Sequence, residues 1–599
     1  LAAYIASTRG IGNVQYRLRF GDRWFIDATN GTTAGAGTLL LDQQKMALNW
    51  YYDSSVTGKD LPLISGTSGP LSGGWTVDGA NTNVYKRTFN VLPKWVFWSE
   101  DDPVYGPLSP VFKGKGRVLA AASGAIRTAM NGVDENAFVV ETDTNTIYVR
   151  VDSTRLAAIN STVRLEVVLA TGSGVKITSG VDGCRVRGIR THGWGMESFN
   201  SQEYGIKVMT DGQNCAIVED SVSLFGPTHA QGHYSPNGGG RCVFKNCAAG
   251  GCLSSAGACT IWVTYSLLGG NQCAFVNCTP LYGALDDGQV YTGATTVFFG
   301  HAGTGSPVVY VNFAMTYGCK VRRDLPSASP VIMANFDVDT PSDPLDPAAC
   351  RNMIVNCVHD GGSTAQWAAP QKGAAVNSQW REMHNPIDNA KAGNACSYHT
   401  TNAGDVAHWI NCTNHVRGDK ITTKLYMTFA SGGAATWYWH SQNSRWRCDL
   451  KPRGQWCGIA PDTKNHTGSR WYNNRVEFSV HDVAGVPRNT WGFVNSALYA
   501  AGNVFVNCQR PAFASYYGYD QTGTPIDFAS NPAVLDNRAD FDDVNPDLEN
   551  MGASPDLPFL AVGYDQEGRL RVNAKPTPGP IEVRTLYKET QPGGTRKVG

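Results

Sequence analysis

A short pattern of apolar residues, then Asn and usually Cys, recurs from the middle of the chain to near its end. Full copies end at Cys247, Cys278, Cys357, Cys412 and Cys508, and looser copies end at Asp220, Asn312 and Asn335. From Asp220 to Asn356 the Asn or Asp positions are 26, 31, 35, 23 and 21 residues apart. A repeat of this length predicts a solenoid, in which stacked coils bury themselves against their neighbours.

Alternating apolar and polar runs predict further strands outside the repeat. Residues 14–20 read as one strand, and residues 138–141 and 146–151 suit a pair of strands. We therefore expect an N-terminal cap with the first strands at 1–115, a parallel β-helix at 116–535, and a closing segment with a terminal extension at 536–599.

The repeat spacing lengthens to 55 and then 96 residues between Asn356 and Asn507. This predicts long loops or an inserted lobe at about 360–500. The lobe is rich in aromatic and basic residues: Trp437, Tyr438, Trp439, His440, Trp446, Arg447, Arg453, Trp456, Arg470, Trp471 and Tyr472. These residues either stack on sugar rings and hold acidic groups, or form the core of the lobe.

Composition narrows the class of protein. With 66 Gly and only 17% charged residues, the chain suits many tight turns between short strands. Fifty basic residues balance fifty acidic ones, so the field needed for non-specific nucleic-acid binding is missing. There is no apolar run of about 18 residues that would span a membrane.

The sixteen Cys residues all follow residue 183 and fall largely into two columns. One column follows the repeat Asn, and the other, four or five residues before it, holds Cys184, Cys215, Cys242 and Cys273. Neighbouring coils lie roughly 4.8 Å apart, so we expect inward stacks of small buried side chains. That separation also permits disulfides between coils, and Cys448 with Cys457 is the better candidate pair.

The coil pattern, the Asn turns and the opening segment Tyr-Arg-Leu-Arg-Phe-Gly-Asp-Arg-Trp at 16–24 together resemble the right-handed parallel β-helix proteins of the pectate-lyase-like superfamily. The tail from Asp556 to Glu582 resembles the closing segment of secreted bacterial members and of some phage proteins. The resemblance implies an all-β, right-handed parallel β-helix. Members include polysaccharide lyases, glycoside hydrolases and phage tailspikes, so the fold alone does not select a function.

Alignment of the coils on the repeat Asn predicts one stripe of ionisable residues. Nine residues past the repeat point stand Glu197, His229, Ser255 and Asp286, and one residue further stand Asp287 and Arg322. A hydrolase needs paired carboxylates roughly 6.5 to 9.5 Å apart for inversion, which Glu197 with Asp286 or Asp287 provides only if loops bring them together. A lyase needs a base and a cation, and His229, His233, Lys207, Arg241 and Arg322 supply both.

Residues 228–234, Thr-His-Ala-Gln-Gly-His-Tyr, place His229, His233 and Tyr234 in an expected loop. Catalysis, a zinc site completed by His301 or Asp286, and ordinary surface histidines are the three interpretations. We assign no metal ligand. The acidic residues at 536–547 are compatible with calcium, but their spacing does not match an EF-hand, so the sequence requires no cofactor.

The sequence thus favours an enzyme acting on extracellular or cell-surface polysaccharide, with a lyase ahead of a hydrolase. Its candidate catalytic residues are Glu197, Lys207, His229, His233, Arg241, Asp286, Asp287 and Arg322, and its candidate substrate-binding residues are Tyr234, Trp437, Trp439, Trp446, Arg447 and Trp471. The alternative is a non-catalytic tailspike, fibre, filament subunit or adhesin on a virion or cell surface. A tailspike would form a homotrimer, whereas a secreted enzyme would be a monomer.

Overall fold

The structure, a computed structural model, contains β-strands joined by turns. It describes residues 12–25, 38–55, 61–69, 71, 73–79, 81–98, 118–120, 137–150, 165–170, 172–194, 203–224, 229–235, 240–250, 259–266, 272–280, 295–301, 308–311, 314–315, 332–335, 352–360, 369–370, 373–384, 394–399, 406–418, 424–430, 438–450, 456–458, 469–478, 489–491, 498–501, 504–506, 517–519, 525–527 and 534–535. Every helix or strand assigned within these ranges is a strand. The all-β prediction is confirmed for this part of the chain.

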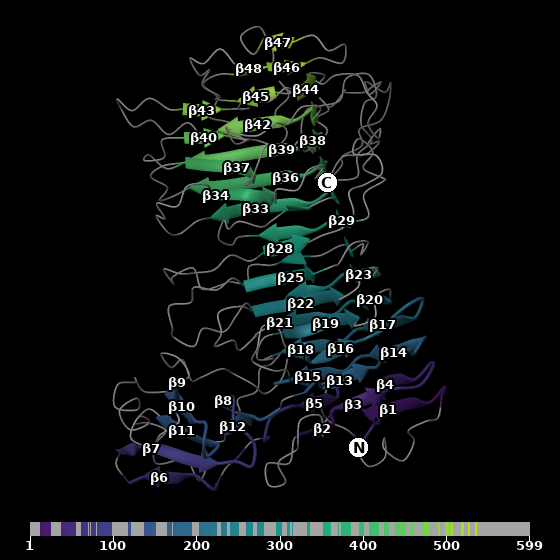
Figure 1. Ribbon diagram of the computed structural model, residues 1–599, viewed down its shortest axis with the longest axis vertical. Coiled ribbons are helices and arrows are strands. Elements are labelled where there is room, and N and C mark those ends of the chain that lie inside the picture. Colours follow the sequence, from purple (N-terminus) through teal and green to yellow (C-terminus); the bar gives the residue numbers. More distant parts are fainter. Residues whose placement is uncertain are drawn as a thin grey trace, which may run out of the picture.

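One long sheet runs through the molecule and takes, through most of the chain, every third strand (Figure 1). In sheet order its strands are β1 (Gln15–Arg19), β4 (Ala47–Tyr51), β14 (Cys184–Arg187), β17 (Cys215–Glu219), β20 (Arg241–Lys245), β23 (Gln272–Val276), β26 (Val308–Val311), β29 (Asn352–Val355), β32 (Gly373–Val376), β35 (Val406–Ile410), β38 (Tyr438–Gln442), β41 (Ser469–Tyr472), β44 (Leu498–Ala501), β46 (Tyr517–Tyr519) and β47 (Pro525–Asp527). Its neighbours pair in parallel, except β46 and β47.

Four further parallel sheets run beside the long sheet. The β3–β31 sheet contains β3 (Leu39–Leu41), β13 (Val175–Ile177), β16 (Ile206–Val208), β19 (His229–Ser235), β22 (Cys259–Ser266), β25 (Thr295–His301), β28 (Ile332–Asn335) and β31 (Ala369–Pro370). The β2–β24 sheet contains β2 (Arg23–Trp24), β5 (Leu63–Ser65), β15 (Arg190–His192), β18 (Val222–Leu224), β21 (Ala248–Gly250) and β24 (Thr279–Pro280).

The other two sheets lie further along the chain. The β27–β48 sheet contains β27 (Ala314–Met315), β30 (Val358–Asp360), β33 (Gln379–His384), β36 (Thr413–Gly418), β39 (Arg445–Leu450), β42 (Arg475–Phe478), β45 (Val504–Val506) and β48 (Val534–Leu535). The β34–β43 sheet contains β34 (Asn394–His399), β37 (Lys424–Ala430), β40 (Trp456–Gly458) and β43 (Asn489–Trp491). Successive coils, such as β13–β14–β15 and β16–β17–β18, give one strand to each of three sheets, an arrangement compatible with a parallel β-helix.

A smaller, mainly antiparallel unit lies beside the first coils (Figure 1). Its strands are β6 (Thr76–Asp78), β7 (Asn81–Thr88), β9 (Val118–Ala120), β10 (Ala137–Glu141) and β11 (Thr146–Arg150) in one sheet, and β8 (Trp95–Trp98) with β12 (Leu165–Val168) in another. The predicted pairing of 138–141 with 146–151 is confirmed, since β10 pairs with β11. β7 pairs with β11, and β1 belongs to the long sheet, so strands on either side of residue 115 share sheets. The boundary at residue 115 stays a prediction.

The Asn of each repeat makes the turn that follows a strand of the long sheet. The turn residues have φ between 49° and 53°: Asp220, Asn246, Asn277, Asn356, Asn377, Asn411, Asn443 and Asn473. Asn and Asp visit this left-handed region more readily than other residues with a side chain. Asn246 Nδ2 donates to Asp220 Oδ1 at 3.0 Å, and Asn277 Nδ2 donates to Asn246 Oδ1 at 3.2 Å. The predicted role of Asn as the turn residue is confirmed.

The residue after the turn Asn faces the interior and bonds to the backbone. Cys412 Sγ lies 3.4 Å from the carbonyl oxygens of Ala375, in the preceding coil, and of Ile410. Ser444, one coil later, occupies the same position, and its Oγ accepts a hydrogen bond from the Cys412 N–H at 3.0 Å. A small side chain with a donor therefore satisfies carbonyl groups that the turn would otherwise leave buried without a partner.

The described strands at 373–478 continue the stack of coils, whereas the long loops or lobe expected at about 360–500 stay a prediction. Asn377, Asn443 and Asn473 are repeat turns that the pattern missed, since Ser or Asn replaces Cys after them. Two copies of the pattern belong elsewhere. Asn335 ends β28 in the β3–β31 sheet, and residues 504–506 form β45 in the β27–β48 sheet. The long gaps between Asn356 and Asn507 therefore contain additional repeat turns that the Asn–Cys pattern did not identify.

Most of the described Cys residues confirm the inward columns. Buried thiols are found at Cys184, Cys242, Cys247, Cys273, Cys278, Cys357 and Cys412. Cys215 is an exception, because it pairs in register with Arg241, whereas Ala216 pairs with Cys242. A shift of one residue turns a strand side chain to the opposite face, which leaves Cys215 half-buried. The side chains of Cys448 and Cys457 lie outside the described part, so that pairing is untested.

Candidate functional site

The strongest candidate for chemistry is a buried lysine on β16. Its neighbours in the strand, Ile206 and Val208, are fully buried in the coil interior, so Lys207 faces the outer side of the sheet. The Lys207 side chain is nevertheless only 4% exposed. Lys176 of β13 and Gly232 of β19 stand beside it in register.

A carboxylate holds the Lys207 ammonium group. Lys207 Nζ donates to Glu203 Oε1 at 3.0 Å, and the other oxygen of Glu203 accepts a hydrogen bond from Ser173 Oγ. Ser173 Oγ in turn accepts from the Tyr204 N–H at 3.1 Å. Burial lowers the pKa of Lys207, Glu203 raises it, and the charge of Lys176 lowers it, with a net downward shift. A buried amine with a lowered pKa is suited to act as a general base.

The predicted loop at residues 228–234 is instead a strand. Residues from His229 to Ser235 form β19, in which His233 pairs with Val208 of β16 and with Thr264 of β22. The Gly in this segment favoured the prediction of a loop, but the pairing of β19 with β16 and β22 overrides that local preference. Lys207, His229, His233 and Tyr234 are thereby brought onto two neighbouring strands. The side chains of the last three lie outside the described part.

The predicted stripe of ionisable residues is wrong in register. His229 pairs with Thr260, which pairs with Thr296, so two coils beyond His229 stands Thr296 rather than Asp286. These three residues lie 9, 14 and 19 residues past their repeat points, because the intervening segments differ in length. Equal offset therefore does not mean equal height in the stack.

Of the remaining candidate catalytic residues, the structure describes Arg241, which lies in a different sheet from Lys207. Arg241 begins β20 in the long sheet, where it is exposed and its Nη2 donates to Gln213 Oε1 at 2.8 Å. Glu197, Asp286, Asp287 and Arg322 lie outside the described residues, so their predicted roles are untested.

The predicted sugar-stacking role of Trp446 is not supported by its position. Its ring is fully buried, packs edge-on against Trp409 at 5.3 Å between centroids, and donates from Nε1 to Ser441 Oγ at 3.0 Å. It is therefore part of the core, as the alternative interpretation held. Arg447 is half-buried on the opposite strand face.

Three other predicted sugar-binding residues are not tested. Trp439 lies in β38 and Trp471 in β41, with side chains outside the described part, and Trp437 lies wholly outside it.

Sequence reasoning missed a buried polar region in the coils whose turns are Asn411, Asn443 and Asn473. Arg445 donates to Glu477 Oε2 from Nε at 3.1 Å and from Nη2 at 2.8 Å, and Arg475 forms an ion pair with the other oxygen. All three side chains are at most 7% exposed. The signal was present in the sequence, because Arg445 and Arg475 each follow a turn Asn by two residues.

Two histidines stack in the same coils. His408 and His440 pair in register on β35 and β38, with ring centroids 4.6 Å apart and an interplanar angle of 22°. Both are buried, although they stand next to the inward-facing Trp409 and Ser441 and so face the other way.

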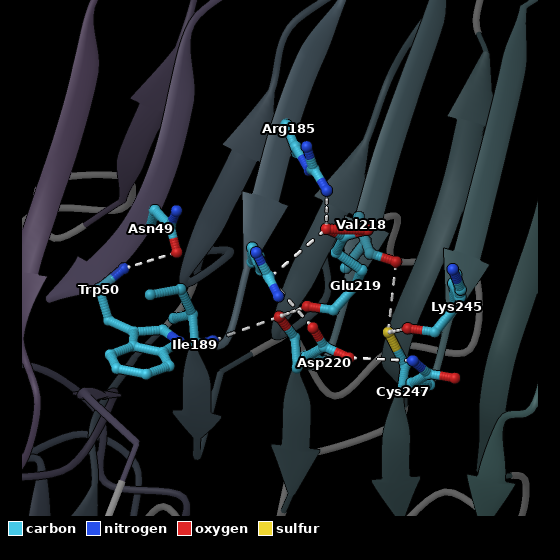
Figure 2. Close-up of polar contacts among 12 residues, drawn as sticks. Asn49, Trp50, Arg185, Ile189, Val218, Glu219, Asp220, Lys245 and Cys247 are labelled. Atoms are coloured by element: carbon cyan, nitrogen blue, oxygen red, sulfur yellow. Dashed lines mark hydrogen bonds and ion pairs between the residues drawn. The ribbon is translucent and has the colours of Figure 1, made fainter.

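The long sheet carries a charged outer face near its N-terminal end (Figure 2). Glu219 of β17 forms ion pairs with Arg185 and Arg187 of β14, and Arg187 Nε also contacts Asp220 Oδ2 at 3.1 Å. Both arginine side chains are about half exposed, at 49% and 48%. These pairs link neighbouring coils in solvent, which accounts for them without a ligand.

Within the described ranges, no group of three or more His, Cys, Asp or Glu residues is arranged to hold a metal ion. In the same ranges, no helix has the length and apolar character needed to cross a membrane.

Comparison with known proteins does not assign a family. No protein-family model matches the chain, and no curated protein is similar to it. The solved structure of XylC with xylose is similar at a TM-score of 0.41 and 10% identity, over 95% of this chain and 94% of that chain. A glycoside hydrolase structure is similar at a TM-score of 0.35 and 8% identity, over 79% of this chain and 92% of that chain. Both TM-scores lie below 0.5, so membership of the pectate-lyase-like superfamily stays a prediction.

Proposed function

We propose that this chain is a right-handed parallel β-helix enzyme that acts on an extracellular or cell-surface polysaccharide. We further propose that it cleaves next to a uronate by β-elimination, with glycoside hydrolysis as the second candidate. The observation that carries the proposal is Lys207, a buried amine with a lowered pKa on the outer face of the parallel β3–β31 sheet. A stack of parallel strands offers an extended polymer a rigid surface along its length.

In this mechanism the neutral amine of Lys207 takes the proton from the carbon next to the uronate carboxylate. The electron pair left behind forms the carbon–carbon double bond as the neighbouring glycosidic C–O bond breaks, and the departing oxygen takes up a proton. Glu203 holds the amine in place through the 3.0 Å hydrogen bond. Lys176, in register with Lys207, supplies a cation that stabilises the developing charge on the carboxylate.

His229, His233 and Tyr234 remain candidates in the same region. They lie on β19, which pairs directly with the strand that carries Lys207. We propose that one of the histidines donates the proton to the departing oxygen and that Tyr234 contacts the sugar. Substitution of His229 by Ala would then slow product formation without lowering the melting temperature.

The proposal is tested by incubating the chain with a panel of acidic and neutral polysaccharides. Reducing ends and the ultraviolet absorbance of unsaturated uronate ends are recorded together. New ends with that absorbance indicate a lyase, new ends without it indicate a hydrolase, and binding with no new ends indicates a non-catalytic protein and overturns the proposal.

Two variants assign the base. Lys207→Arg keeps the positive charge beside Glu203 but cannot give up its proton near neutral pH, so we expect it to fold and to lose activity by at least about a hundredfold. Lys245→Met alters an exposed lysine on the long sheet and serves as the matched control, with unchanged activity expected. Full activity of Lys207→Arg would remove Lys207 from the mechanism.

The pH dependence of activity distinguishes a catalytic role of Lys207 from a purely structural one. Activity should rise with pH as Lys207 loses its proton. Glu203→Gln removes the carboxylate charge that raises the pKa of Lys207, so the rising limb should move to lower pH. An unshifted limb would show that another group is the base.

A further inference from the structure

Three aromatic side chains gather where the first two strands of the long sheet end. We call Phe20, Trp50 and Tyr52 the aromatic platform. Tyr52 is 66% exposed. The ring of Phe20 lies 5.1 Å from that of Trp50 and 6.4 Å from that of Tyr52, so the exposed ring rests on a partly buried one. Tyr51 pairs in register with Arg19 and points to the opposite face of β4, so it is not part of the platform.

The backbone of the next coil fixes this arrangement. Gly188, the turn residue of that coil, has φ +63°, and a Cβ built on it would lie 2.2 Å from Trp50 Nε1. No residue other than Gly fits beneath this indole ring. In addition, the Trp50 N–H donates to Asn49 Oδ1 at 2.8 Å (Figure 2). Trp50 is therefore held against the turn, and it packs against Phe20, on which Tyr52 rests.

Polar groups lie beside the platform in the sequence and are themselves held in place. Arg19 donates to Asp22 Oδ1 from Nε at 2.9 Å and from Nη2 at 2.7 Å. Asp53 Oδ1 accepts hydrogen bonds from the Ser55 N–H at 2.9 Å and from Ser55 Oγ at 2.7 Å. Because Arg19 and Asp22 pair with each other, the charge of Asp53 leaves these groups negative as a set, which disfavours an anionic glycan.

We propose that the aromatic platform is a binding site for an uncharged glycan, with a pyranose ring stacked on Tyr52. A pyranose with equatorial hydroxyls has an apolar C–H face, which matches the exposed ring of Tyr52. Its polar edge needs hydrogen-bonding groups of the kind that Arg19, Asp22 and Asp53 carry. Tyr offers such a ring a large apolar area together with a polar hydroxyl tip. The platform lies on the long sheet and not on the β3–β31 sheet that carries Lys207, so it is a second site that does not depend on the proposed catalysis.

The test measures binding of the full-length chain to neutral hexasaccharides of β-1,4-linked glucose, xylose and mannose and to a galacturonate oligomer, by titration calorimetry. Tyr52→Ala removes the most exposed ring and should weaken binding of the neutral hexasaccharide by roughly three- to tenfold. Val77→Ala, which alters a residue 48% exposed in the antiparallel unit, is the control and should leave binding unchanged.

Each outcome has a definite meaning. Binding of a neutral hexasaccharide that Tyr52→Ala weakens and Val77→Ala does not would support the platform. Absence of binding to every neutral hexasaccharide, or equal binding by Tyr52→Ala, would overturn it. Binding of the galacturonate oligomer alone, unaffected by Tyr52→Ala, would place the glycan elsewhere and also overturn it. None of these results depends on whether Lys207 is the catalytic base.

Discussion

We predict that removal of the buried carboxylate of Glu477 strongly destabilises the fold. Glu477 is fully buried between Arg445 and Arg475, whose side chains are 7% and 3% exposed. Substitution by Ala would remove the carboxylate that both guanidinium groups contact and leave those two groups shielded from water. Breaking a buried ion pair by removing one partner costs about 3–5 kcal/mol of unfolding free energy.

Glu219 provides the matched control, because it too forms ion pairs with two arginines on the stack. Its partners, Arg185 and Arg187, are about half exposed, so their charges stay hydrated when the carboxylate is lost. Glu219→Ala should therefore cost only about 0–1 kcal/mol. The contrast tests whether burial of the remaining charges, and not the number of ion pairs, sets the loss.

The assay is urea denaturation followed by circular dichroism, with the midpoint and the slope compared between variants. We expect Glu477→Ala to lower the midpoint clearly and Glu219→Ala to leave it nearly unchanged. A loss for Glu477→Ala no larger than that for Glu219→Ala would refute the reasoning. Glu477→Gln, which keeps the shape of the side chain but not its charge, should fall between the wild type and Glu477→Ala.

Three further predictions concern buried groups. Burial and the nearby charge of Arg190 hold the pKa of His192 well below its ordinary 6.5, so only the unfolded chain takes up this proton; thermal stability should fall as pH drops below about 6.5, and less so in His192→Gln. Cys412→Ser should melt close to the wild type, because Ser444 fills the equivalent position, whereas Cys412→Val should cost about 1–3 kcal/mol by leaving carbonyls unpaired. Burial raises the pKa of the Cys412 thiol to about 12, so a thiol reagent should label half-buried Cys215 first and Cys412 only on unfolding; equal labelling rates would contradict this.

The turn chemistry was readable from the sequence because it is local. A left-handed turn favours Asn, and the position after it needs a small donor, so the Asn–Cys pattern marks coils wherever both conditions are met by those residues. The turns at Asn377 and Asn443 were not identified because Ser, which is also a small donor, follows them in place of Cys. Part of the long spacing from which we predicted long loops or a lobe comes from those missed turns.

The candidate site was less predictable, because it depends on strand register. Lys207 was identified from its residue type, but its burial, its bond to Glu203 and its pairing with β19 follow from the fold. The stripe that joined His229 to Asp286 failed because segments of unequal length separate the turns from the next strand. The position of a residue along the stack therefore cannot be found by counting residues from the turn Asn.

By itself the sequence determined that the chain is all-β, that its coils repeat, that Asn makes the turns and that Cys faces inward. These properties follow from backbone preferences and from side-chain size, which act over a few residues. Only the tertiary structure decided which residues share a face: the burial of Trp446, the Arg445–Glu477–Arg475 ion pairs, and the place of Trp50 over Gly188. Those contacts join residues of different coils, and a shift of one residue in register would undo them.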